Sequence, residues 1–165
     1  MTSLTLTSRS EFLRIRGLRY HLRRWGDERL PMLFLGHGFL DVSATFEPLV
    51  APLVDRWQVI APDWRGFGHT EWPAEGYWFP DYIADLDAIL EHYSPEAPLQ
   101  LIGHSMGAQI VSLYAGLRPA RVDKLVLLDG VTLPDMPPKL APHRYRNWLN
   151  EQREPLRERR YESFD

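Results

Sequence analysis

A serine between two glycines is the first candidate for chemistry in this chain. Residues 103–107 read Gly-His-Ser-Met-Gly, directly after the apolar run 99–102 and before a stretch with helical periodicity. This pattern predicts a sharp turn from strand to helix, because the two glycines leave room for the helix to fold back over the strand. Such a turn exposes the hydroxyl of Ser105, so the sequence predicts a serine nucleophile that attacks a carbonyl carbon.

A second glycine-rich segment, Gly-His-Gly-Phe at positions 36–39, follows the apolar run 32–35. A strand that ends in His37 and Gly38 leaves the backbone N–H of Phe39 free to face an active site. A negative charge that develops on a substrate oxygen needs such a donor. We therefore interpret this segment as an oxyanion loop.

Short apolar runs alternate with stretches of helical periodicity over most of the chain. The runs that read as buried strands lie at 32–35, 58–61, 99–102 and 124–128, and helical spacing occurs at 45–54, 82–90 and 108–119. Strands that alternate with helices in this way predict an α/β fold, with a mostly parallel sheet and helices on both of its faces.

Apolar and polar residues alternate in two short runs, 13–16 and 20–23, with Gly17 between them, which predicts two antiparallel strands with one solvated face. His21 lies on that face in this interpretation. The same region contains five arginines, which are Arg14, Arg16, Arg19, Arg23 and Arg24. A patch that binds nucleic acid is the alternative, but no aromatic stacking platform accompanies the arginines, and the net charge of the chain is −3. We therefore expect a solvated strand face and no nucleic-acid partner.

Asp63 and His69 lie in a loop with two glycines and an arginine, after the apolar run 58–61. A catalytic role for these two side chains is one interpretation. The composition favours the other, in which side-chain hydrogen bonds hold the loop backbone. The chain contains no cysteine and so lacks the commonest zinc ligand, and we expect neither a metal site nor a cofactor.

The order of these elements and motifs resembles the first half of the α/β-hydrolase superfamily. The resemblance covers residues 12–130, and the Gly-His-Ser-Met-Gly turn is similar to that of esterases and serine-hydrolase-like proteins. It implies Ser105 as the nucleophile, with the N–H groups of Phe39 and Met106 as the oxyanion hole. Serine at this position differs from the aspartate that haloalkane dehalogenases and epoxide hydrolases carry there.

The resemblance also implies a histidine base that follows the last strand of the fold, after the acid. None of the six histidines occupies that place. His37 belongs to the oxyanion loop, and His104 adjoins the nucleophile with its side chain expected to point elsewhere. His21 and His92 are expected to be exposed, and His143 lies in a proline-rich segment. We therefore expect that this chain does not contain the base.

Asp129 ends the last predicted strand, 124–128. A minority of the family places the acid of the triad at the end of this strand, so Asp129 is a candidate to orient a histidine. The alternative is an aspartate that forms a loop before Gly130. Both interpretations stay open.

The composition changes near residue 134, where four prolines precede a charged, amphipathic stretch from 144 to 165. We predict that residues 1–133 form the hydrolase core and that residues 134–165 begin a helical lid. The predicted strand 124–128 is apolar on both faces, yet no later segment could pair with its outer side. We therefore expect a core truncated after its sixth strand, which needs the remainder of a hydrolase chain to complete the sheet.

The chain shows neither a secretion signal nor a run of 18 apolar residues, which predicts a cytoplasmic protein without a membrane partner. The function predicted from these features is a serine hydrolase that acts on a carboxylic ester or similar small acyl substrate. The alternative is a non-catalytic interaction protein, or an inactive fragment, with a hydrolase fold.

Overall fold

The computed structural model describes residues 7–130 and 137–151 of the 165-residue chain. The chain divides into two compact units, Met1–Thr132 and Leu133–Asp165. The first unit contains a sheet with its helices, and the second contains one longer helix. Each unit is described by itself.

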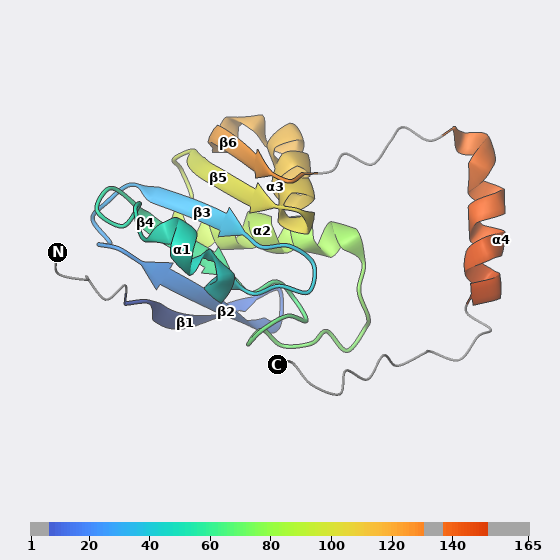
Figure 1. The fold of residues 1–165 in the computed structure, drawn as a ribbon, viewed down its shortest axis with the longest axis horizontal. Coiled ribbons are helices and arrows are strands. Elements are labelled where there is room, and N and C mark those ends of the chain that lie inside the picture. Colours follow the sequence, from blue (N-terminus) through green and yellow to red (C-terminus); the bar gives the residue numbers. More distant parts are fainter. Residues whose placement is uncertain (1–6, 131–136, 152–165) are drawn as a thin grey trace. The chain divides into compact units, whose positions relative to one another are not determined.

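A six-stranded sheet forms the first unit, in the order β1-β2-β4-β3-β5-β6 (Figure 1). The strands are β1 (Arg9–Ile15), β2 (Leu18–Trp25), β3 (Met32–Gly36), β4 (Gln58–Pro62), β5 (Leu99–His104) and β6 (Val122–Leu128). Strands β4, β3, β5 and β6 are parallel, whereas β2 runs antiparallel to both β1 and β4. The predicted α/β fold with a mostly parallel sheet is confirmed.

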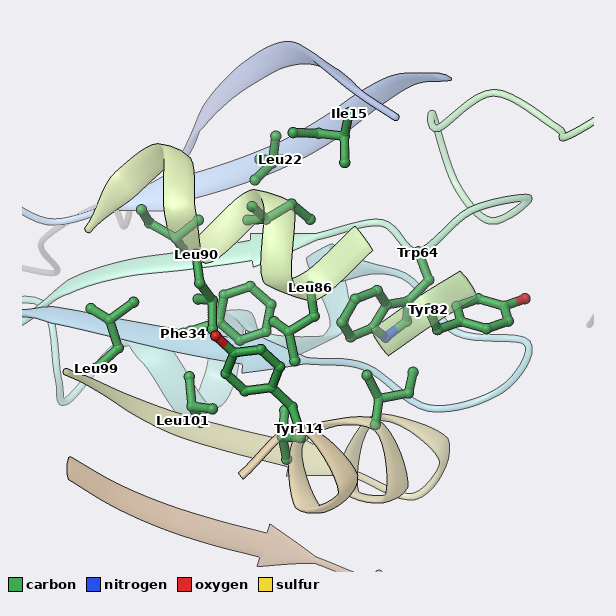
Figure 2. Close-up of a cluster of buried hydrophobic side chains, with 14 of the residues drawn as sticks. Ile15, Leu22, Phe34, Trp64, Tyr82, Leu86, Leu90, Leu99, Leu101 and Tyr114 are labelled. Carbon is green, nitrogen blue, oxygen red and sulfur yellow. The ribbon is translucent and has the colours of Figure 1, made fainter. Parts of the chain in front are cut away.

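Helices cover both faces of the central strands. They are η1 (Ser43–Phe46), α1 (Glu47–Val50), α2 (Phe79–Tyr93) and α3 (Met106–Leu117). Phe34 of β3 packs into a cluster with residues of α2 and α3, and Figure 2 shows this cluster between the helices and the sheet. Its neighbours Leu33 and Leu35 point to the opposite face and pack with η1 and α1. Because side chains alternate along a strand, this continuous apolar run contributes to two cores.

Two helical segments differ from the predicted spans in length or type. Helical structure in the predicted span 45–54 ends at Val50 and is followed by a turn. Pro52 explains the early end, since proline has no N–H to extend the helical hydrogen bonds. The residues that follow α3 form a short 3-10 turn, η2 (Pro119–Arg121), which leads into β6.

The expectation that His21 is exposed is wrong. Its side chain is fully buried on β2, because Ser10 of β1 and Asp63 of the loop after β4 both contact its ring. The arginines of this region follow the prediction more closely: Arg14, Arg16 and Arg19 are exposed, and Arg23 and Arg24 are half-buried. The face is therefore solvated at its rim but contains a buried polar centre.

Strand β6 lies at the edge of the sheet and, among the described residues, pairs only with β5. Its apolar side chains are partly in solvent, with 45% of Val126, 43% of Leu127 and 36% of Leu128 exposed. An exposed apolar edge is a template for pairing with a further strand. Within the described residues, the predicted apolar edge is present.

The second unit contains η3 (Pro138–Leu140) and α4 (Ala141–Glu151). His143 is exposed on α4, and its Nε2 lies 3.3 Å from the side-chain nitrogen of Asn147, one turn later. Residues 152–165 of the predicted lid lie outside the described residues, and the assignment of 134–165 as a lid stays a prediction. None of the helices in the described ranges is long and apolar enough to cross a membrane.

Candidate active site

Ser105 lies at the turn between β5 and α3, with backbone angles φ 49° and ψ −113°. A positive φ is unfavourable for a residue with a side chain, so the surrounding packing must hold this turn. A Cβ atom on Gly103 would lie 2.5 Å from the carbonyl oxygen of Gly107, and one on Gly107 would lie 2.6 Å from that of His37. Real Cβ atoms do not approach so closely. The two glycines therefore permit the close packing that presents Ser105 between strand and helix.

The loop after β3 lies against the Ser105 turn. A Cβ atom on Gly38 would lie 3.2 Å from the Cβ of Ser105 and 3.1 Å from Nδ1 of His104. Phe39 follows at once and is 65% exposed. Met106 is the first residue of α3, and the N–H groups of the first helical turn have no partner within the helix. The chain thus brings together the loop and the helix start that the sequence analysis named as the oxyanion hole.

His37 fixes the conformation of this loop. Its ring is fully buried, and its Nε2 accepts a hydrogen bond of 2.9 Å from the backbone N–H of Trp64. Nδ1 must then carry the proton, which it donates to the carbonyl oxygen of Gly38 at 2.7 Å. The indole N–H of Trp64 also donates to the carbonyl oxygen of His37, at 3.0 Å. Burial lowers the pKa of His37, which keeps the ring neutral and suits this arrangement.

Asp63 is the centre of the loop that follows β4. Its carboxylate accepts hydrogen bonds from the backbone N–H groups of Ser43 and His69, at 2.7 and 2.9 Å, and contacts Nδ1 of His21 at 2.8 Å. Burial alone would raise the pKa of Asp63, but these hydrogen bonds lower it below its ordinary value. The side-chain hydrogen bonds predicted for this loop are therefore present. His69 itself is exposed and contributes its backbone N–H.

A buried ion pair supports the same loop from the other side. Arg65 donates two hydrogen bonds to Asp85 of α2, at 2.6 and 2.7 Å, and the Tyr20 hydroxyl donates a third at 2.6 Å. Arg16 reaches the same carboxylate at 3.0 Å. Burial alone would lower the pKa of Arg65, but Asp85 raises it above its ordinary value. Asp85 of α2 thus anchors the loop through Arg65.

Asp129 directly follows β6, and Ser105 directly follows β5, so both lie at the carboxyl ends of parallel strands. The backbone N–H of Ser105 donates to the carbonyl oxygen of Leu128 at 3.0 Å, and Asp129 is the next residue. Asp129 is exposed and has a positive φ of 48°, which is unusual for a residue other than glycine. The two residues thus follow adjacent parallel strands.

No hydrogen bond joins the Ser105 hydroxyl to a histidine ring within residues 7–130. His21 and His37 are buried and bonded to other groups, whereas His69 and His92 are exposed. The sequence analysis did not single out the roles of Trp64 and Asp85. Their partners lie 27 and 20 residues away along the chain, so no local pattern indicates these contacts.

A protein-family model described as "alpha/beta hydrolase fold" matches residues 31–162 of the chain. The chain therefore belongs to the α/β-hydrolase family. Among curated proteins, it is 37% identical over 108 residues to a serine hydrolase-like protein of Danio rerio, a match that covers 64% of this chain and 32% of the relative. It is 31% identical over 115 residues to epoxide hydrolase 4 of Mus musculus, covering 68% of this chain and 32% of that protein.

Solved structures show the same fold. The thioesterase domain from the curacin biosynthetic pathway superposes with a TM-score of 0.77 at 25% identity, covering 90% of this chain and 53% of the domain. These similar proteins differ in the reaction that their names state. The chain spans about a third of the length of the two curated relatives. The matches show the family of this chain, and the reactions in these names are those of the relatives.

Proposed function

We propose that this chain provides the nucleophile and oxyanion hole of a serine hydrolase that acts on a carboxylic ester or similar acyl substrate. The observation that carries the proposal is the Ser105 turn, where a strained backbone is held between β5 and α3 by glycine contacts. Strain of this kind costs on the order of 1–3 kcal/mol and persists where function requires it. A turn that only connected a strand to a helix would not need it.

The proposed chemistry is acyl transfer to water. The Ser105 hydroxyl attacks the carbonyl carbon, and the backbone N–H groups of Phe39 and Met106 donate to the oxygen that becomes negative. Loss of one such donor costs on the order of 100- to 1000-fold in rate. His37 supports this proposal, because its hydrogen bonds to Gly38 and Trp64 hold the loop that carries the Phe39 donor.

The proton of Ser105 must pass to a base, and in this proposal the base is a histidine that residues 1–165 do not supply. Asp129 is positioned after the neighbouring strand, where it could orient such a histidine. The epoxide hydrolase similarity leaves the reaction class open at the level of the family. Serine rather than aspartate at position 105 favours the ester over the epoxide. A cytoplasmic location also stays a prediction.

Labelling of the full-length protein with a fluorophosphonate tests the role of Ser105. We expect the label on Ser105 and its loss in Ser105→Ala, whereas Ser112→Ala, on the helix that follows Ser105, retains it. If the peptide that contains position 105 is still labelled in the Ser105→Ala variant, the proposal is contradicted. A Ser105 that never reacts in a folded protein would contradict it equally.

The second candidate function is a non-catalytic interaction protein with a hydrolase fold. It is favoured by the absence of a hydrogen bond between Ser105 and a histidine within residues 7–130. Hydrolysis of a short-chain p-nitrophenyl ester by the 165-residue chain, lost in Ser105→Ala, would reject this candidate. We expect little or no such Ser105-dependent activity from these residues alone.

A further inference from the structure

A different serine, Ser10, heads a chain of side-chain hydrogen bonds on the antiparallel strands. The Ser10 hydroxyl lies 2.9 Å from Nε2 of His21, and Nδ1 of the same ring lies 2.8 Å from the carboxylate of Asp63. An ionised carboxylate only accepts hydrogen bonds, so Nδ1 carries the proton and Nε2 presents its lone pair to the serine. This is the order of groups that activates a serine nucleophile.

The middle of this arrangement is rigidly held. The ring of His21 is fully buried, and the rings of Phe12 and His69 lie 5.1 and 5.0 Å from it, centre to centre. Asp63 is fixed in turn by two backbone N–H groups. Ser10, in contrast, is exposed on β1. A shielded base therefore faces a serine that solvent and small molecules can reach.

Arg23 supplies a positively charged donor beside the serine. Arg23 and Ser10 are directly paired across β1 and β2, so both side chains lie on one face of the sheet. One terminal nitrogen of Arg23 donates to the Ser8 hydroxyl at 2.8 Å. Its buried Nε–H has no hydrogen-bond partner among the described residues. An unsatisfied buried donor is costly, and this one belongs to the side chain that is paired with Ser10 across the two strands.

We propose that Ser10, His21 and Asp63 form a second nucleophilic site, which accepts the acyl group of a small, unhindered ester. The Ser10 O–H bond breaks and its proton moves to Nε2 of His21, while Oγ bonds to the carbonyl carbon. The bond to the leaving alkoxide then breaks, and that oxygen takes the proton from His21. Water repeats the sequence on the acyl group, which releases a carboxylic acid and restores the Ser10 hydroxyl.

Acetylation by p-nitrophenyl acetate tests this proposal in the full chain with the Ser105→Ala substitution, so that the two proposed sites are separated. Peptide mass spectrometry measures the rate at each serine. We expect Ser10 to be acetylated about 100-fold faster than Ser8, which lies two residues away without a histidine partner. His21→Gln can still donate to Asp63 but has no basic nitrogen, and we expect it to remove this advantage.

His92→Gln, at the exposed end of α2, is the matched control and should leave the Ser10 rate unchanged. Equal acetylation of Ser10 and Ser8 would overturn the proposal, and this comparison does not depend on whether His21→Gln folds. A Ser10 rate that is unaltered in a folded His21→Gln variant would also overturn it. Neither result bears on Ser105, which is absent from the tested chain.

Discussion

The two serine sites differ in what the fold provides for each. Ser105 has a strained backbone and closely packed glycines around it, but within residues 7–130 no histidine is bonded to its hydroxyl. Ser10 lies on an ordinary strand, yet its hydroxyl contacts a buried histidine whose other nitrogen faces a carboxylate. Presentation of a nucleophile therefore depends on backbone geometry, whereas its activation depends on side chains from other elements. In this chain the strained backbone lies at Ser105, and the contact with a histidine lies at Ser10.

One loop nevertheless serves both sites. Asp63 orients His21 beneath Ser10, and the next residue, Trp64, donates its backbone N–H to His37 in the loop after β3. Arg65 then ties the loop to α2 through Asp85. A substitution at this shared support should therefore affect both sites, whereas a substitution beside one serine should affect that site alone.

The largest effect is expected from Asp85→Asn. This change leaves the buried Arg65 without its main carboxylate partner, and breaking a buried ion pair typically costs about 3–5 kcal/mol of unfolding free energy. Urea denaturation measures the loss. Both serine sites should lose reactivity in proportion to the unfolded fraction.

Asp87→Asn is the control for this prediction. Asp87 is also on α2, but its side chain is 44% exposed and its carboxylate lies 3.6 Å from the guanidinium of the exposed Arg118, so we expect a change within about 0.5 kcal/mol. A loss below about 1 kcal/mol in Asp85→Asn would show that the ion pair is not the anchor of the loop.

An intermediate effect, confined to Ser105, is expected from Gly107→Ala. The new Cβ would meet the backbone carbonyl oxygens of Gly36 and His37, so α3 must move away from the loop. A displacement of about 1 Å can cost on the order of 100-fold in rate, and we expect that loss in fluorophosphonate labelling of Ser105. The rate at Ser10 should not change.

Gly116→Ala is the matched substitution on the same helix. No atom lies within 4 Å of a Cβ at that position, and the change should stabilise the helix by about 0.5–1 kcal/mol. Equal labelling rates in the two variants would mean that the glycine contacts do not position Ser105.

The smallest effect is expected from pH. Burial lowers the pKa of both His21 and His37 below their ordinary value of 6.5, so between pH 6.5 and the lower folded-state values the unfolded chain binds more protons. Stability should therefore fall as the pH decreases through this window, by at most about 1.4 kcal/mol per pH unit for each histidine. Hydrogen bonds lower the pKa of Asp63 from its ordinary 3.8, so its contribution is lost only at more acidic pH.

Urea denaturation between pH 7 and 5 gives this slope. His37→Gln and His21→Gln should each make it shallower, and the two variants separate the oxyanion loop from the Ser10 site. A slope that neither substitution alters would exclude both histidines as its source.

Much of the fold could be predicted from the sequence because its signals are local. The glycines around Ser105 and the apolar runs of β3 and β5 lie within a few residues of the features they determine. The burial of His21 could not be predicted in this way. Its partners Ser10 and Asp63 lie 11 and 42 residues away, and an alternating strand pattern does not show that a loop covers the polar face.

The same distinction between local signals and distant contacts holds for the candidate site. The sequence predicts the strand, turn and helix around Ser105, but it does not predict the hydrogen bonds that hold the loop after β3. His37 follows β3, and its contact with Trp64 requires β3 and β4 to be neighbours. That adjacency is a property of the sheet order rather than of any segment.

The hydrogen bond from Ser105 to Leu128 connects the nucleophile to the edge of the sheet. The amide proton of Ser105 is held by a carbonyl oxygen of β6, which, among the described residues, has a neighbour on one side only. Edge strands open more readily than central ones, so this proton should exchange with solvent at the rate at which β6 detaches. Hydrogen exchange at the amide of Ser105, the residue proposed as the nucleophile, therefore reports how often β6 detaches from the sheet.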